Sequence, residues 1–170
     1  YANLIEILNK ISNCLNEEEI FRECLNRSKW VIDFQSLNVV FYRKNSQLVK
    51  YYQVVGSDEV KSEIGTKSKL VTFIENSPEQ TLVIDCENNK ELFSEAGQGY
   101  GVGIPEGINY LFATKIYDGV KVSEIILFGT VSTKGFTKND RILLRILASI
   151  MSSSTGRIRS ENDLKEMHSQ

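Results

Sequence analysis

The hydrophobic pattern at the start of the chain predicts two helices. Apolar residues recur at alternating steps of four and three from Leu4 to Leu15, which is the spacing of an amphipathic helix. Asn16 follows as a helix cap, and Glu19 stands three residues later to complete a capping box. A second apolar face then extends to Ile32. We therefore expect two consecutive helices.

After residue 37 the apolar residues alternate with a period of two, which is typical of β-strands. The segments rich in Val, Ile, Tyr and Phe are residues 37–43, 47–55, 81–85, 109–117 and 121–132. Lys44-Asn45-Ser46 and Asp118-Gly119 lie between neighbouring segments as hairpin turns. The pattern predicts a sheet built largely from hairpins.

Shorter helical patterns cover residues 70–74 and 90–96, and a capping box at residues 137–140 opens a long helix that we expect to reach about residue 167. This order predicts an α+β fold with a central antiparallel sheet of about five strands. The terminal helices would cover one face of the sheet. Residues 69–76 and 90–103 would form the roof of a pocket on the other face.

Three stretches carry a resemblance to the GAF family of small-molecule sensor domains. Residues 68–85 resemble the family's helix, turn and hydrophobic-Asp strand, and residues 109–129 resemble its central hairpin. Gly135-Phe136-Thr137, with Asp140, is similar to the start of its last helix. One departure is Lys115, where many members carry Pro. The related PAS domain shares the sheet but usually lacks the two opening helices, so we rank it second.

The resemblance implies a non-catalytic sensory or regulatory domain of a cytoplasmic signalling protein. Residues 1–158 would form this domain, and residues 159–170 would begin a signalling or linker helix. A bound small molecule would repack the roof, and the last helix would relay the change to an output domain outside this sequence. A histidine kinase of a two-component system, a response regulator, a cyclase or a phosphatase would fit that role.

Candidate ligand-binding residues follow from the predicted elements and from residue type. We expect them to line the roofed pocket, although a shift of one residue along a strand would turn its side chains to the other face. They are Phe41, Phe73, Asp85, Phe93, Tyr110, Phe112 and Thr114.

Composition narrows the choice of partners. The 170 residues carry 20 basic and 22 acidic side chains without a basic stripe, so we expect no nucleic-acid partner. The longest apolar runs are far shorter than the roughly 20 residues that cross a bilayer, so we expect no membrane span. The first residues show no charged region followed by an apolar stretch and a cleavage site, so we expect no export signal. Three cysteines without a C-x-x-C pair indicate a reducing compartment, by default the cytoplasm.

Catalytic and metal sites are not predicted. The single histidine, His168, lies near the end of the sequence, away from the neighbours that would hold a catalytic base. Cys14 and Cys24 fall on helical faces as small core residues. Cys86 follows a strand and is the one candidate for a reactive thiol. Bilin-binding GAF domains typically have His after the attachment Cys, whereas Glu87 stands here. The GAF-type methionine-sulfoxide reductases need several cysteines around the pocket.

No cofactor is predicted. Lys134, Phe136 and Asp140 match part of the signature of cyclic-nucleotide-binding GAF domains, but Thr133 and Arg141 replace its Asn and Glu. The alternating glycines of residues 97–103 lack the strand–loop–helix setting of a phosphate loop. We interpret them as a loop over the pocket, or as a plain surface loop.

Two alternatives to a ligand sensor remain. Apolar stripes on the terminal helices, with the small residues 152–156, predict a homodimer and would also suit a ligand-free dimerisation module. A methionine-sulfoxide-reductase-type enzyme is the weaker alternative, because it would need a reactive Cys86.

Overall fold

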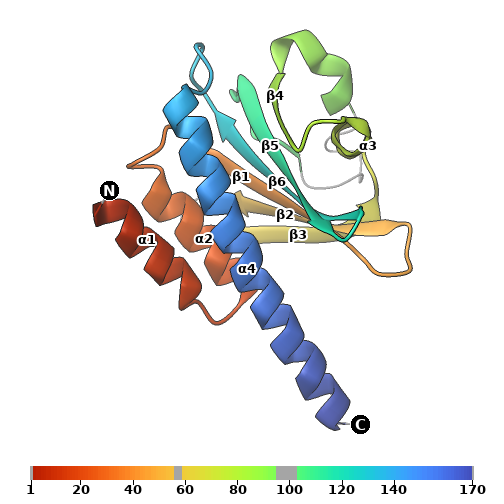
Figure 1. Cartoon of the computed structure of the whole chain (residues 1–170). Coiled ribbons are helices and arrows are strands. Elements are labelled where there is room, and N and C mark those ends of the chain that lie inside the picture. The colour runs from red at the N-terminus through yellow and green to blue at the C-terminus, as the bar shows by residue number, and fades with distance from the viewer. Residues whose placement is uncertain (1, 56–58, 95–102, 170) are drawn as a thin grey trace.

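The computed structural model describes residues 2–55, 59–94 and 103–169. It has three layers, with a sheet between a group of long helices and a roof of short ones (Figure 1). The long helices are α1 (Ala2–Ser12), α2 (Glu17–Ser28) and α4 (Lys138–Ser169). The roof contains α3 (Lys69–Asn76) and the 3₁₀ segment η1 (Glu87–Phe93).

Six antiparallel strands form the sheet, in the order β3-β2-β1-β6-β5-β4. Two three-stranded meanders are joined where β1 pairs with β6. The strands are β1 (Ser36–Tyr42), β2 (Leu48–Val55), β3 (Glu59–Thr66), β4 (Thr81–Asp85), β5 (Tyr110–Asp118) and β6 (Lys121–Thr130). The predicted α+β class and antiparallel sheet are confirmed.

The sixth strand, β3, is absent from the sequence-based prediction. Its side chains are mostly polar and exposed, because β3 is an edge strand. All eight of its residues nevertheless pair with β2. β3 is therefore defined by backbone pairing with β2. Such pairing leaves no hydrophobic pattern in the sequence.

The helix caps follow the predicted chemistry. Asn16 accepts a hydrogen bond from the Glu19 backbone amide at 2.8 Å, and the Glu19 carboxylate accepts one from the Leu15 amide. Thr137 and Asp140 form the reciprocal box at the start of α4. Leu15 differs from expectation: α1 ends at Ser12, and Leu15 lies in the connection with 85% of its surface exposed.

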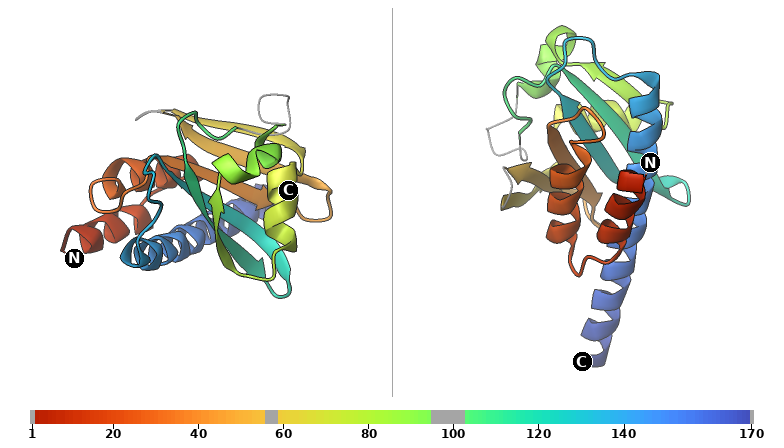
Figure 2. Two further views of the ribbon diagram at one scale, coloured as in Figure 1. Left: turned by 90° about the horizontal axis from the view of Figure 1, so that it is seen from above. Right: turned by 90° about the vertical axis from the view of Figure 1, so that its left-hand side faces the viewer.

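The three long helices pack against each other and against one face of the sheet. The two further views show α4 continuing past the other helices to the C-terminal end of the chain (Figure 2). Every side chain described from Ser160 to Met167 is exposed. Among the described residues, no helix is long and apolar enough to cross a membrane.

Candidate ligand-binding face

The sheet separates two hydrophobic clusters, which define its two faces. The helix face packs against α1, α2 and α4 and includes Phe41, Phe112 and Phe128. The roof face packs against α3, η1 and residues 104–108 and includes Val40 and Leu111. Because side chains alternate along a strand, neighbours such as Leu111 and Phe112 belong to different faces.

Four of the seven predicted ligand-binding residues lie on the helix face. Phe41 and Phe112 are buried in its core. Thr114 is buried beside Ile146 of α4. Tyr110 follows the same alternation, and its ring lies 3.6 Å from the position that a Cβ on Gly135 would occupy. The predicted facing of these strands was wrong by one residue, which reverses the side chains.

The other three predicted residues are attached to the roof but differ in role. Phe73 is on the outer side of α3 and 43% exposed. Asp85 is bonded to the start of η1, where its carboxylate accepts hydrogen bonds from the Glu87 amide at 3.1 Å and the Asn88 side chain at 2.7 Å. Phe93 packs on the roof-face cluster. Of the seven predicted residues, Phe93 alone belongs to that cluster.

Asn38 is a polar residue on the roof face that sequence reasoning missed. It is 4% exposed and pairs in register with Leu127 of the roof-face cluster. Its amide nitrogen donates to the Gly103 carbonyl at 3.4 Å, while its Oδ1 atom is buried without a hydrogen-bond partner. A buried acceptor without a partner is costly, and a ligand with a hydrogen-bond donor would satisfy it. The signal for this site in the sequence is a single Asn among the apolar residues of the predicted strand 37–43.

Lys115 joins β5 to the roof. Its side chain is 1% exposed, and its Nζ donates to the Ser77 carbonyl at the end of α3. The Lys115 backbone also exchanges hydrogen bonds with Gln80. In this chain a buried ammonium therefore holds α3 at the position where many GAF domains carry Pro.

A groove of about 680 Å³ runs along the outside of α3. Its wall combines Phe73 and Leu92 with two lysines, Lys67 and Lys69. Lys67 is already paired with Glu75 at 3.1 Å, so its charge is balanced within the protein. The groove lies outside the roof, and the roof itself separates it from the inner face that carries Asn38.

The cysteines do not gather into a redox site. Cys14 and Cys24 are buried on the helix face, whereas Cys86 packs at the margin of the roof-face cluster. Burial, followed by the charge of Asp85, raises the pKa of the Cys86 thiol to about 11. Little reactive thiolate is present at neutral pH with such a pKa. Among the described residues, no group of three or more His, Cys, Asp or Glu could hold a metal ion.

Two of the three residues that match the cyclic-nucleotide signature have structural roles. Phe136 packs on the helix face with its ring 6.1 Å from that of Phe112. Asp140 belongs to the capping box of α4. Both lie away from the roof face. The glycine-rich loop falls outside the described residues except for Gly103.

No sequence-family model matches the chain, and a comparison with well-characterised proteins also finds no match. Solved structures do match along nearly its whole length. The GAF domain of a phosphoenolpyruvate-protein phosphotransferase from Acinetobacter has a TM-score of 0.65 at 10% identity, over 94% of this chain and 93% of that one. The GAF domain of a two-component sensor histidine kinase from Bacillus halodurans has a TM-score of 0.63 at 12% identity, over 88% and 99%.

This chain has the GAF fold. An enzyme shares the fold as well. The free methionine-R-sulfoxide reductase of Neisseria meningitidis, solved with its substrate, has a TM-score of 0.59 at 9% identity over 93% of this chain and 89% of that one. The GAF fold alone therefore does not separate sensor from enzyme, and the chemistry of the site must do so.

Proposed function

We propose that this GAF domain is a non-catalytic sensory module of a cytoplasmic signalling protein. It would bind a small molecule between the sheet and the roof, and α4 would relay the binding to an output domain. Similar folds in a sensor kinase and in a phosphotransferase support the signalling context. The odd number of cysteines supports the location.

One observation carries the ligand proposal: the unpartnered Oδ1 of Asn38 on the roof face. Apolar side chains of the roof-face cluster, such as Leu127, would supply most of the binding area, and Asn38 would fix the orientation of the ligand. Of the predicted site residues, Phe93 remains in this proposal. The other six predicted residues would affect ligand binding only indirectly, through the packing of the fold.

Native mass spectrometry of the purified protein, incubated with a metabolite extract, tests the proposal. We expect a retained mass of a few hundred daltons, typical of a small metabolite. Asn38→Ala should weaken its retention by about tenfold, because one hydrogen bond in a buried site is lost. Asn139→Ala, at an exposed position at the start of α4, is the matched control. If both variants retain the molecule equally well, Asn38 does not bind it.

The reductase alternative predicts a reactive thiol at Cys86. Its raised pKa and the position of the other cysteines on the helix face favour the sensor. Turnover of free methionine sulfoxide that disappears in Cys86→Ser would reverse this preference. We expect no turnover in either protein.

A further inference from the structure

Glu124 is a carboxylic acid buried beneath α4. It lies on β6 and is 4% exposed, and its neighbours across the sheet are Phe41 and Ile116. Alternation with Ile125 and Ile126 places its side chain on the helix face. Its Oε1 atom is buried and accepts no hydrogen bond. Since a buried charge without partners is costly, such a carboxyl favours its neutral form.

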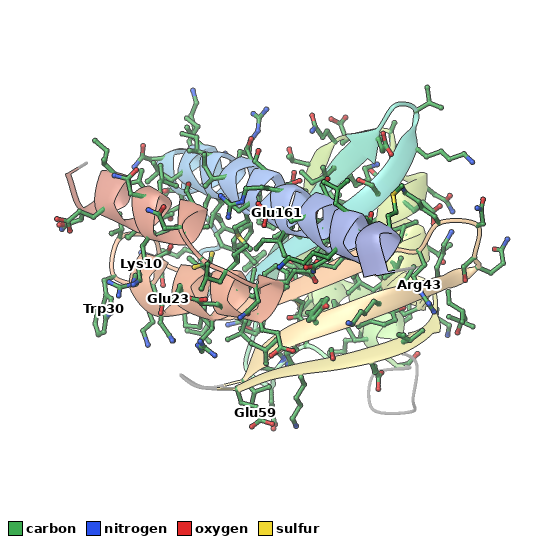
Figure 3. The ribbon with its side chains drawn as sticks, turned by 90° about the horizontal axis from the view of Figure 1, so that it is seen from below. Lys10, Glu23, Trp30, Arg43, Glu59 and Glu161 are labelled. Atoms are coloured by element: carbon green, nitrogen blue, oxygen red, sulfur yellow. The ribbon has the colours of Figure 1, made fainter. Side chains whose placement is uncertain are left out.

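Two residues of α4 act on this carboxyl, namely Ser152 through a side-chain hydrogen bond and Arg159 through its charge. They are seven residues apart and therefore share one face of the helix. Figure 3 shows α4, with Glu161 labelled, lying across the strands and beside α2. Glu124 is thus positioned under the last packed turns of α4.

Arg159 has a different partner for its hydrogen bond. Its Nε donates to the Glu17 carboxylate at 2.7 Å, and its Cζ lies 3.3 Å from the centroid of the Phe41 ring. The other Glu17 oxygen accepts a hydrogen bond from the Tyr52 hydroxyl at 2.9 Å. Glu17 is the first residue of α2, so this pair ties α4 to the start of α2.

The same place is where α4 leaves the domain. Arg157 donates to the Ser12 and Cys14 carbonyls at the end of α1, and Ile158 is the last buried residue among the described side chains of the helix. Beyond Arg159, the described side chains are exposed. Among the described side chains, the Arg159–Glu17 pair is therefore the last contact between the body and the projecting part of α4.

We propose that Glu124 and Glu17 compete for Arg159, so that the protonation of Glu124 sets how firmly α4 is tied to α2. With Glu124 protonated, Arg159 stays on Glu17 as observed. When Glu124 releases its proton to solvent, two carboxylates face one guanidinium, and Arg159 is drawn from Glu17 toward Glu124. This regulation by protons is separate from ligand binding at the roof face.

The surroundings of Glu124 place its titration in the physiological range. Burial, opposed by Arg159 and Ser152 and reinforced by Glu17, raises its pKa to about 7. Two more charged groups act on the neighbouring Tyr52, namely Lys50, 4.9 Å from its ring centroid, and Glu18 through its charge. Neither is the hydrogen-bond partner of Arg159 or Glu17 in this structure.

Amide hydrogen exchange of the full chain at about pH 6 and pH 8, on either side of this pKa, tests the proposal. After correction for intrinsic exchange, peptides covering residues 14–20 and 157–165 should exchange about threefold faster at the higher pH, because the tie opens locally. Glu124→Gln should abolish this difference. Glu63→Gln is the matched control and should keep it, since Glu63 is also an acid with a buried, unpartnered oxygen but pairs with Tyr51 of the roof-face cluster.

Two further measurements keep the test decisive even if Glu124→Gln folds poorly. Glu17→Gln should give fast exchange of both segments at both pH values, because the observed partner of Arg159 is weakened. Carbon-13 NMR should show the wild-type Glu124 carboxyl titrating near neutral pH. Corrected exchange that is the same at both pH values, or titration of Glu124 near the value of an exposed glutamate, would overturn the proposal.

Discussion

The two proposed sites each centre on one buried polar side chain of the sheet. Asn38 and Glu124 lie in neighbouring strands of one sheet but on opposite faces, and each has a buried oxygen without a hydrogen-bond partner. In an apolar setting such an atom lowers stability until a ligand, a proton or a neighbouring charge satisfies it. These two residues are therefore the positions at which we propose that a ligand and protons act on the fold.

The pKa of Glu124 predicts how stability depends on pH. Its folded-state pKa of about 7 is above the ordinary 4.5, so ionisation costs more in the folded than in the unfolded state. The cost is absent below the ordinary value, grows as the pH rises toward 7, and is complete above it. It amounts to about 3 kcal/mol. Urea unfolding from pH 5 to pH 8 should show a decline for wild type that Glu124→Gln lacks. Parallel curves for the two proteins would contradict this.

A second prediction at the residue scale concerns the effect of glycine substitutions on stability. A Cβ on Gly129 would lie 2.1 Å from the Ser36 hydroxyl oxygen and 2.9 Å from Ile108. Gly129→Ala should therefore lower the free energy of unfolding by about 1–3 kcal/mol through overpacking. At Gly156, which is helical, a Cβ would meet no atom within 4 Å apart from its own helix backbone and chain neighbours, so Gly156→Ala should raise this free energy by roughly 0.5–1 kcal/mol. Chemical denaturation distinguishes the two, and effects of the same sign would be inconsistent with this packing.

At the scale of elements, the sequence predicted the helices and turns, which local chemistry determines. It missed the features that strand pairing determines. The helices with caps and the hairpin at Gly119, whose φ is 67°, are present where local residues favour them. β3 and the facing of β1 and β5 depend on neighbouring strands, so no local pattern specifies them. The same limit applies to the site: residue type suggested Phe112, but its facing excludes it from the roof face.

The flank of α4 that faces away from the core bears on self-association, which remains a prediction. Ile142 and Ile146 are each more than 40% exposed and border a groove of about 380 Å³ beside Thr114. If the terminal helices form a homodimer, this apolar flank is the surface they would use. Leu147, by contrast, is fully buried and would report on folding rather than on association.

Ile146→Glu should shift a dimer toward monomer in sedimentation velocity, because it places a charge on that flank. Val120→Glu is the matched control, since Val120 is 94% exposed at the tip of the β5–β6 hairpin. It should leave the sedimentation coefficient unchanged. A wild-type protein that is monomeric at high concentration would remove the dimer prediction.

For the molecule as a whole, the division between the folded body and the projecting helix is testable by truncation. In residues 161–170 every described side chain is exposed, so removing this segment should change the free energy of unfolding by less than about 0.5 kcal/mol. Removing residues 157–170 also deletes buried Ile158 and both arginine clamps. It should cost more than about 2 kcal/mol. Equal stability of the two truncated proteins would mean that residues 157–160 contribute nothing to the body, and would contradict the contacts of Arg157, Ile158 and Arg159.

The unbroken course of α4 has a consequence for any segment that follows it. A continuous α-helix turns by about 100° per residue, so the orientation of a downstream domain depends on the number of residues between it and Arg159. One residue inserted after position 161 would rotate such a domain by about that angle, and seven would restore nearly the original direction. The rotation of the downstream domain about the helix axis, rather than the length of the linker, would then determine whether that domain responds to a change in this one.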